Sequence, residues 1–191
     1  MNTKASLREQ VLLKRKSLSE KEQLESGESL VKLWKSIEGL YRAKKIALYW
    51  PVNREISTNS LISYFLKDGS KCFLPVIAQD KENKILEFAP YWAESLRTNN
   101  RFNISEPSTS ERVDLNELDV IFLPCLCFDS KGNRIGMGGG FYDKTLDHLS
   151  NNKKPKLILL AYDFQEVESC FPESHDIKAD ACLTPNKFLK F

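Results

Sequence analysis

The sequence predicts a single α/β domain over residues 1–191, in which a mainly parallel sheet lies between two layers of helices. Three observations lead to this expectation. A length of 191 residues corresponds to one domain at roughly 150 residues per domain. Residues 46–77 have the pattern of one β-α-β unit. Residues 119–124 form an almost fully apolar run, which is typical of a strand that helices cover on both faces. Residues 1–38 are expected to form a pair of helices packed on this domain.

The composition is that of a globular protein, with 41% apolar and 28% charged residues. It excludes a disordered, collagen-like or disulfide-scaffold protein. The longest apolar run, residues 120–128, is too short for a membrane span, which needs about 20 residues. The N-terminus is charged within its first eight residues and lacks the apolar stretch of a secretory signal. We therefore expect a soluble, cytoplasmic protein.

Cysteine usage argues against a disulfide framework or a structural zinc site. Five cysteines cannot all pair within one chain, and none stands in a C-x-x-C arrangement. Cys125 and Cys127 are one residue apart in an apolar run, which predicts buried thiols. The chain has only two histidines, which are too few for a typical His-rich metal site.

The net charge of +2 hides an asymmetry along the chain. Residues 1–45 carry eleven Lys/Arg and six Glu, a net charge of +5, and the remainder carries 17 basic against 20 acidic residues, a net charge of −3. A basic N-terminal segment can bind nucleic acid or a phosphorylated ligand, or it can simply face solvent.

The sequence of the basic segment predicts two helices. Residues 4–16 have apolar residues at helical spacing, and Lys4, Arg8 and Arg15 fall within about 40° of one another on one face at 100° per residue. Ser19 and Glu22 form a capping box, which predicts a second helix to Ile37. The residues expected on the buried side of the second helix are Leu24, Leu30, Val31, Trp34 and Ile37.

The remaining elements alternate between strands and helices. A strand at 46–50 is followed by a helix that Ser57 or Thr58 caps and that runs to Gly69. The other predicted elements are strands at 72–77, 85–88, 119–124 and 157–161, a polar loop at 94–116 and a helix at 141–149.

A glycine-rich loop precedes the last predicted helix. Five of the eight glycines lie between positions 132 and 140, and four of them belong to the segment Arg134-Ile-Gly-Met-Gly-Gly-Gly-Phe-Tyr-Asp143. The segment fits neither the P-loop nor the dinucleotide-binding pattern. Its chemistry nevertheless favours an anion, because glycine amides and a helix N-terminus attract phosphate and Arg134 adds a bidentate donor. The alternative is a flexible turn, which three consecutive glycines make costly to order.

This segment closely resembles the R-x-G-x-G-x-G-[YF]-Y-D motif of the 5-formyltetrahydrofolate cyclo-ligase family, also called methenyltetrahydrofolate synthetases. Met137 stands where relatives often carry Arg or an aromatic residue, and Phe141 replaces a common Tyr. The resemblance extends over most of the chain. Its other matching segments are Lys4-Ala-Ser-Leu-Arg8, Trp50-Pro-Val-Asn-Arg-Glu55, Leu74-Pro75, Glu106-Pro107, and His175-Asp176-Ile-Lys-Ala-Asp180 with Thr184.

The resemblance implies an ATP-dependent ligase that cyclises 5-formyltetrahydrofolate to 5,10-methenyltetrahydrofolate with release of ADP and phosphate. It also implies Mg²⁺ as cofactor and a three-layer fold similar to that of sugar-phosphate isomerases and CoA transferases. The expected partners are the two small-molecule substrates, without nucleic acid or membrane, and the expected state is a monomer.

The resemblance assigns roles by position. Arg134 and Tyr142 are expected to act in catalysis, and Asp143 and Asp176 to hold magnesium, with Asp180 as the alternative to Asp176. The residues expected at the folate are Trp50, Glu55, Met137 and Phe141. The residues expected at ATP are Lys4, Arg8, Arg134, Gly136, Met137, Gly138, Gly139, Gly140, Phe141 and Tyr142.

The residue types suit this chemistry, although each has an ordinary structural explanation. Phosphoryl transfer needs positioning and charge neutralisation, which arginine, lysine and backbone amides supply. A carboxylate such as Glu55 accepts hydrogen bonds from the ring N–H groups of a pterin, and Trp50 offers an aromatic wall. Conversely, Asp143 could simply complement a helix dipole, and Asp176 could form a turn.

Two hypotheses from other classes stay open at this stage. One is a sugar-phosphate-binding isomerase or regulator of the same fold, without ATP turnover. The other is a nucleic-acid-binding module that uses the basic helices. Against it, four glutamates interrupt the basic run, and the sequence contains no recognisable nucleic-acid-binding motif.

Overall fold

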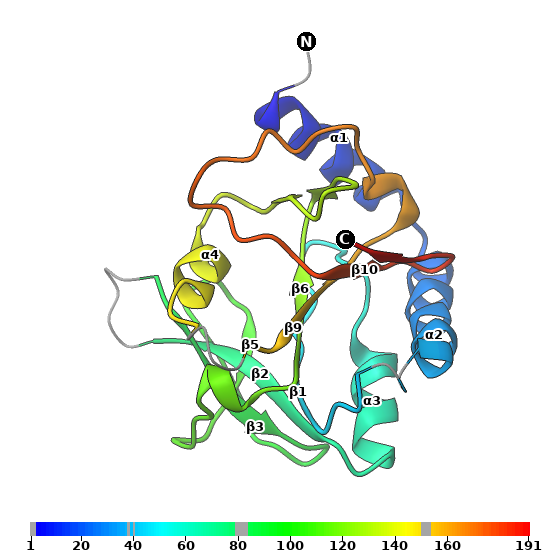
Figure 1. The fold of residues 1–191 in the computed structure, drawn as a ribbon. Helices are drawn as coiled ribbons and strands as arrows, with labels where there is room; N and C mark the ends of the chain where they lie inside the picture. Colours follow the sequence, from blue (N-terminus) through cyan, green and yellow to red (C-terminus); the bar gives the residue numbers. More distant parts are fainter. Residues whose placement is uncertain (1–2, 38, 40, 79–83, 150–153) are drawn as a thin grey trace.

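The computed structural model describes residues 3–37, 39, 41–78, 84–149 and 154–191. Helices surround a central twisted sheet (Figure 1). The helices are α1 (Lys4–Ser17), α2 (Glu20–Ile37), α3 (Asn59–Lys67) and α4 (Phe141–Leu146). The strands are β1 (Lys45–Ala47), β2 (Lys71–Ile77), β3 (Leu86–Tyr91), β4 (Arg97–Asn99), β5 (Ser105–Pro107), β6 (Val120–Pro124), β7 (Cys127–Phe128), β8 (Arg134–Ile135), β9 (Lys156–Leu160), β10 (Ala181–Leu183) and β11 (Phe188–Lys190).

The central sheet has seven strands in the order β11-β10-β9-β6-β1-β2-β3. The strands from β10 to β2 pair in parallel, and β11 and β3 add one antiparallel strand at each edge. The predicted β-α-β unit is confirmed, because β1 and β2 pair in parallel across α3. The sheet is therefore mainly parallel, as the sequence predicts. The similarity to sugar-phosphate isomerases and CoA transferases stays a prediction.

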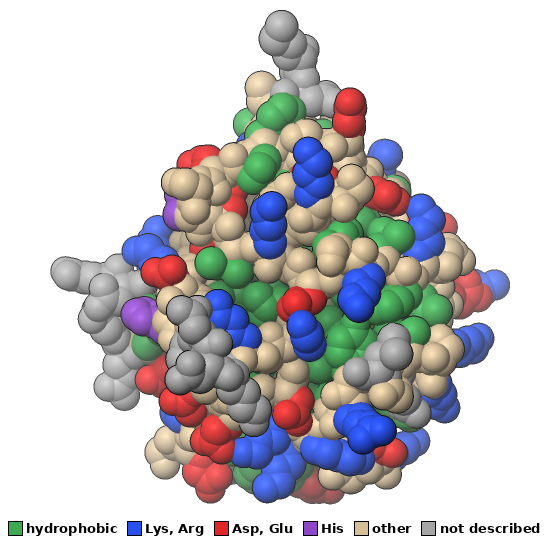
Figure 2. Space-filling model, in the orientation of Figure 1, with side chains coloured by type: hydrophobic (Ala, Val, Ile, Leu, Met, Phe, Trp, Pro, Cys, Tyr) green, Lys and Arg blue, Asp and Glu red, His purple; other side chains and the backbone are tan. Residues whose placement is uncertain are grey.

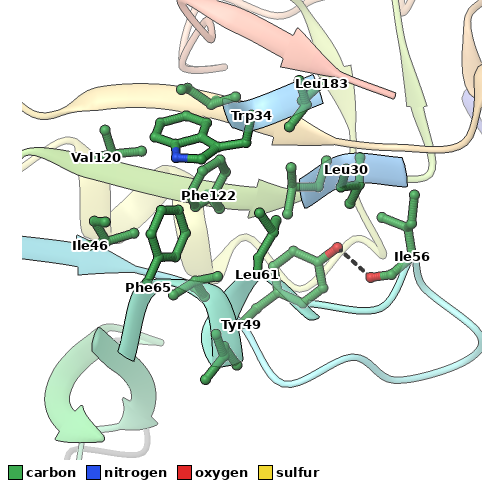
Figure 3. Close-up of a cluster of buried hydrophobic side chains, with 14 of the residues drawn as sticks. Leu30, Trp34, Ile46, Tyr49, Ile56, Leu61, Phe65, Val120, Phe122 and Leu183 are labelled. Atoms are coloured by element: carbon green, nitrogen blue, oxygen red, sulfur yellow. Dashed lines mark hydrogen bonds between the residues drawn. The ribbon is translucent and has the colours of Figure 1, made fainter. Parts of the chain in front are cut away.

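Alternate side chains of β6 pack on opposite faces of the sheet, as the pleat of a strand requires. Val120 and Phe122 face the layer made by α2 and α3. Figure 3 shows this cluster, in which the Phe122 ring lies 5.3 Å from Trp34 and 5.9 Å from Phe65. Ile121 and Leu123 face the opposite layer, where α4 contributes Leu146. Helices on both faces explain why this strand is apolar throughout.

The two N-terminal helices separate in space (Figure 1). α2 packs on α3 and on the sheet, whereas α1 packs against the β7–β8 hairpin through Leu7 and Val11. The predicted capping box of α2 is confirmed, because Ser19 and Glu22 exchange hydrogen bonds between side chain and backbone amide. The prediction for Leu24 is wrong: 59% of this residue is exposed, because it lies on the side of α2 that faces solvent.

The basic stripe predicted on α1 does not form one continuous surface. Arg15 is only 1% exposed and points into the protein. On the face that Figure 2 shows, basic and acidic side chains are interspersed. The N-terminal segment therefore presents no continuous basic face in this view.

The segment 94–116 is more regular than its polar sequence suggests. It contains an antiparallel hairpin of β4 and β5 and ends within a short 3-10 turn at Leu115–Glu117. All three residues of β4 are exposed, so no alternation of apolar and polar residues marks the strand. The helix predicted at 141–149 is regular only to Leu146.

All five cysteines are buried and free, which confirms the buried thiols predicted for Cys125 and Cys127. Burial raises the pKa of the Cys72 and Cys125 thiols to about 12. Among the described residues, no helix combines the length and the apolar character that a bilayer crossing requires.

Candidate active site

Several segments that follow the parallel strands meet at the carboxyl edge of the sheet. Tyr49 and Trp50 follow β1, Cys125 follows β6, and Tyr162 follows β9. In open α/β sheets, this edge is where ligands bind. The N-terminal half of α1 and the segment 170–178, orange in Figure 1, lie at the same edge.

The glycine loop connects β8 to α4 and requires glycine at two positions. Gly138 has φ of 90°, and Gly140, at the N-cap of α4, has φ of 73°. Both lie in the left-handed region, which residues with a side chain rarely adopt. Arg8 reaches the loop from α1, and its Nε donates to the Gly136 carbonyl over 2.9 Å. The loop therefore places its amides next to a cation from another element.

Arg134 and Asp143 form an ion pair that joins the two ends of this loop. Arg134 Nη2 lies 2.7 Å from Asp143 Oδ1, and Nη1 donates to the Ile177 carbonyl. The same Oδ1 accepts a hydrogen bond from the Ile177 amide over 3.2 Å. β8, α4 and the segment around Ile177 thus share one polar cluster.

Lys4 makes a second link to this segment. Its Nζ lies 2.8 Å from Glu173 Oε1 and 3.3 Å from Asp176 Oδ2. The hydrogen bond to Glu173 is the main cause that raises the pKa of Lys4. Burial acts to raise the pKa of Asp176, but the Glu173 amide and the Lys4 ammonium outweigh it and hold that pKa below its usual value.

Asp143 and Asp176 are connected through one short segment. Asp143 contacts the Ile177 amide, and Asp176 is the preceding residue. Asp180 lies elsewhere: it pairs with Lys156 over 2.9 Å and accepts from the Leu157 amide at the start of β9. Of the two carboxylates that the sequence left open, Asp176 is therefore the one near the glycine loop.

Glu55 is buried at the other side of the site, with 7% of the residue exposed. Its Oε2 accepts from the Val52 amide over 3.1 Å, and its Oε1 lies 4.0 Å from Arg15 Nη1. Burial raises the pKa of Glu55 to about 7, although the Val52 amide and Arg15 both act to lower it. Glu55 therefore changes its charge near neutral pH.

Aromatic residues line the space around Trp50. The Arg97 guanidinium lies over the Trp50 ring at 4.5 Å, and the Tyr91 ring is 6.3 Å away. Of the two remaining predicted folate contacts, Met137 is 52% exposed, and Phe141 meets Phe102 of the β4–β5 hairpin edge-to-face at 5.9 Å.

Tyr142 lies between the two sides of the site. Burial raises the pKa of its phenol well above the usual value, with the Glu55 carboxylate adding to the rise and Arg134 opposing it. The hydroxyl therefore stays protonated at neutral pH. It can donate one hydrogen bond to a ligand.

Sequence reasoning missed Arg15, Arg97 and Phe102 as neighbours of the site. Arg15 stands in the basic stripe of the first predicted helix, but nothing local shows that it turns inward. Phe102 is an apolar residue within a polar segment, which was the available signal for a contact. Arg97 carries no local signal.

The comparison with known proteins agrees with this geometry. The sequence matches the 5-formyltetrahydrofolate cyclo-ligase family over residues 1–185. It is 41% identical over 138 residues to the 5-formyltetrahydrofolate cyclo-ligase of Haemophilus influenzae, covering 71% of this chain and 73% of the relative. It is 32% identical over 176 residues to that of Escherichia coli K12, covering 91% and 96%.

Solved structures give the same result for the fold. The structure is similar to Aquifex aeolicus 5,10-methenyltetrahydrofolate synthetase, with a TM-score of 0.83, 30% identity, and coverage of 98% of this chain and 92% of the other. A synthetase from Mycoplasma pneumoniae shares the fold, with a TM-score of 0.74, 24% identity, and coverage of 97% and 100%. The glycine-loop motif, the match along nearly the whole chain and the shared fold together show that this protein belongs to the 5-formyltetrahydrofolate cyclo-ligase family.

Proposed function

We propose that this protein converts 5-formyltetrahydrofolate to 5,10-methenyltetrahydrofolate and uses ATP to do so. Membership of the family supports the cyclo-ligase reaction. One observation carries the use of ATP: Lys4 and Arg8 from α1 and Arg134 from β8 come together at the glycine loop and the adjoining segment around Asp176. Three cations and a glycine loop at a helix N-terminus suit a polyphosphate.

The phosphates of ATP would lie on the amides of residues 136–140. Arg8 is held beside this loop by its bond to the Gly136 carbonyl, so its remaining N–H groups can donate to phosphate oxygens. Lys4 is close enough to add a point charge once Glu173, which is 59% exposed at its side chain, turns into solvent. Positioning and charge neutralisation of this kind are the main requirements of phosphoryl transfer.

The carboxylates of Asp143 and Asp176 fit magnesium. Both could supply hard oxygen ligands, since Asp143 contacts the Ile177 amide and Asp176 is the residue before Ile177. The described residues contain no cluster of three or more potential metal ligands. A site with two carboxylates suits an ion that completes its shell with phosphate and water. When bound, magnesium neutralises charge on the phosphate oxygens.

The folate would lie on the side of Glu55 and Trp50. An ionised Glu55 accepts hydrogen bonds from ring N–H groups, and the buried position makes such bonds selective because water does not compete. Trp50, Phe141 and Phe102 offer aromatic surface for the flat part of the substrate. The Tyr142 hydroxyl lies between this side and Arg134, where it can orient the formyl group.

The proposed reaction takes place between the nucleotide side and the folate side of the site. The formyl oxygen attacks the γ-phosphorus of ATP, and the bond from that phosphorus to the β-γ bridging oxygen breaks, so ADP leaves. N10 then attacks the activated formyl carbon and loses its proton. The carbon–oxygen bond breaks, and phosphate departs with the former formyl oxygen. Arg134 and Arg8 stabilise the charge that develops on the transferred group.

A direct assay tests this function. Purified protein mixed with 5-formyltetrahydrofolate, ATP and Mg²⁺ should produce the absorbance of the methenyl product, with ADP and phosphate formed in equal amounts. Formation of the methenyl product without ATP would contradict the proposal, and so would the lack of product in the presence of ATP. An isomerase or regulator of the same fold would bind a sugar phosphate and release no ADP.

Two pairs of variants connect the assay to the site. Lys4→Met should raise the KM for ATP, whereas Lys21→Met, at a lysine side chain that is 82% exposed on α2, should leave it unchanged. Glu55→Gln should raise the KM for the folate with little change for ATP, and Glu87→Gln, at a surface partner of Arg112, should change neither. We still predict that the protein is a cytosolic monomer and that it binds no nucleic acid.

A further inference from the structure

Arg15 is buried, and only part of its guanidinium forms hydrogen bonds with the described residues. The residue is 1% exposed, and Nη2 donates to the Cys125 carbonyl. Nε and Nη1 are buried and have no hydrogen-bond partner within the part of the chain that the structure describes. A guanidinium stays protonated in proteins, so this side chain places a full positive charge in the interior. Such a charge is costly unless an opposite charge lies nearby.

Glu55 supplies that opposite charge. Of the carboxylates that the structure describes, it alone lies within 4.0 Å of Arg15, with Oε1 at 4.0 Å from Nη1. The distance is too long for a hydrogen bond, but in a buried setting the attraction between the two charges is strong. The other titratable groups that face Glu55 are Tyr49, Cys125, Tyr142 and Tyr162. Burial raises the pKa of each of them, so they are neutral near pH 7, and Arg15 is the facing cation.

The turn that carries Glu55 is also attached to α1. Asn53 and Arg54 both have positive φ, at 48° and 54°, and the Glu55 amide donates to the Val52 carbonyl over 2.9 Å. Two consecutive residues in this region cost conformational energy and persist only where other contacts hold them. Arg54 provides such contacts, because its Nη1 donates to the Lys16 and Leu18 carbonyls at the end of α1. The same helix therefore holds the turn and presents Arg15 to Glu55.

We propose that Arg15 is a positioning residue that keeps the buried Glu55 carboxylate charged and oriented to accept the ring N–H groups of the folate. This inference rests on the proposed function for the role of Glu55 as the folate-binding carboxylate. Arg15 does not itself touch the reacting atoms. Its charge offsets the desolvation of Glu55, so that a carboxylate in the interior can still act as an acceptor at neutral pH.

Kinetics against pH separate this role from a purely structural one. Arg15→Met keeps the length and apolar stem of the side chain but removes the charge. We expect it to raise the folate KM about ten-fold at pH near 7, with the KM for ATP nearly unchanged. The folate KM should recover as the pH rises, because Glu55 then ionises without help. Arg15→Lys should restore most of the affinity at neutral pH, and Arg112→Met, at a surface arginine paired with Glu87, should leave the profile unchanged.

A double variant tests whether the effect passes through Glu55. In a Glu55→Gln background, Arg15→Met should cause no further rise in the folate KM, because the carboxylate on which it acts is gone. At a pH high enough to ionise Glu55 in Arg15→Met, the double variant should also unfold at a higher temperature than Arg15→Met alone, since it has no buried charge without a partner. Independent losses in folate affinity, or a pH profile that Arg15→Met does not move, would overturn the proposal.

A measurement that needs no turnover keeps this proposal distinct from the proposed function. The Glu55 carboxyl carbon can be followed by NMR in protein labelled with ¹³C at glutamate, with its signal assigned from Glu55→Gln. Arg15→Met should move the midpoint of its titration upward by about one pH unit or more. An unmoved midpoint contradicts the role of Arg15. A moved midpoint in a protein that makes no methenyl product keeps the electrostatic role and removes the proposed reaction.

Discussion

Arg134 Nη2 and Asp143 Oδ1 lie 2.7 Å apart, on opposite sides of the glycine loop in the sequence. The Arg134 side chain is only 5% exposed, whereas that of Asp143 is 29% exposed. Arg134 thus has an anionic partner within the protein, and Asp143 keeps one side toward solvent. The pair joins the two ends of the loop without any ligand, so the loop amides would already be in place for the phosphates that we propose.

Replacing Arg134 should weaken ATP binding. Arg134→Ala removes charge-assisted contacts worth about 1.5–3 kcal/mol, and it also releases Asp143 from its partner. Calorimetric titration with ATP should show an affinity that is lower by roughly ten-fold or more. Arg112→Ala is the matched control, because Arg112 makes a comparable 2.7 Å pair with Glu87 on the surface. An unchanged ATP affinity in a folded Arg134→Ala protein would remove this residue from the nucleotide site.

Asp143→Asn tests the proposed magnesium ligand. The amide keeps the shape and one acceptor oxygen but loses the negative charge that magnesium needs. Turnover should fall sharply, and the magnesium concentration for half-maximal turnover should rise. Because the change also weakens the pair with Arg134, we expect a stability loss of about 1 kcal/mol.

The control for this variant is Asp147→Asn, at an exposed aspartate that ends the same helix. It should leave the magnesium dependence unchanged. If Asp143→Asn loses stability but turns over normally with an unaltered magnesium curve, Asp143 is only the partner of Arg134.

Gly138→Ala should impair ATP binding through the backbone. At φ of 90°, a side chain costs about 1–2 kcal/mol, and a Cβ here would lie 3.9 Å from Arg8 Nη2. The loop would relax to another conformation and displace its amides, which isothermal titration with ATP would detect. Gly69→Ala is the matched control, because Gly69 has φ of 76° with open space around it and lies outside the site. Equal effects of the two variants on ATP affinity would contradict this prediction.

The titration of Glu55 should appear in the pH dependence of stability. The pKa of Glu55 is about 7 in the folded chain against an ordinary value of 4.5. Between these two values, the folded state binds more protons than the unfolded state, so the contribution of Glu55 to stability falls as the pH rises. The free energy of unfolding of the wild type minus that of Glu55→Gln should therefore decrease by about 3 kcal/mol across this window.

Chemical denaturation at several pH values measures this difference. A difference that stays constant, or one that increases with pH, would show that Glu55 does not titrate as described.

The sequence predicted those elements whose signals are local. The capping box of Ser19 and Glu22 and the apolar run of β6 depend on neighbouring residues, and both are confirmed. The glycine loop was placed before a helix because glycine and helix-start signals are equally local. The family resemblance added the distant residues of the site, such as Lys4 and Asp176, which are 172 positions apart.

Features that depend on distant partners were not predicted. Arg15 occupies the position of a surface residue in the helical pattern, and its counter-charge lies 40 positions later in the chain. Ser57 or Thr58 was expected to cap α3. The N-cap residue is Thr58, but its hydroxyl donates to the Tyr49 carbonyl, whereas the Ser57 hydroxyl accepts from the Asn59 amide over 3.3 Å. The short strands β4 and β10 carry too few residues for a periodic pattern, and pairing with β5 and with β9 and β11 defines them.

The burial of all five cysteines makes this protein suitable for site-directed labelling. Alkylating reagents react with accessible thiolates, and the native thiols are enclosed, with pKa values raised by burial. A cysteine introduced at the exposed Leu24, on the side of α2 that faces solvent, would then be the one reactive thiol of the folded chain. A fluorophore attached there would allow binding and unfolding to be followed without removing any native cysteine.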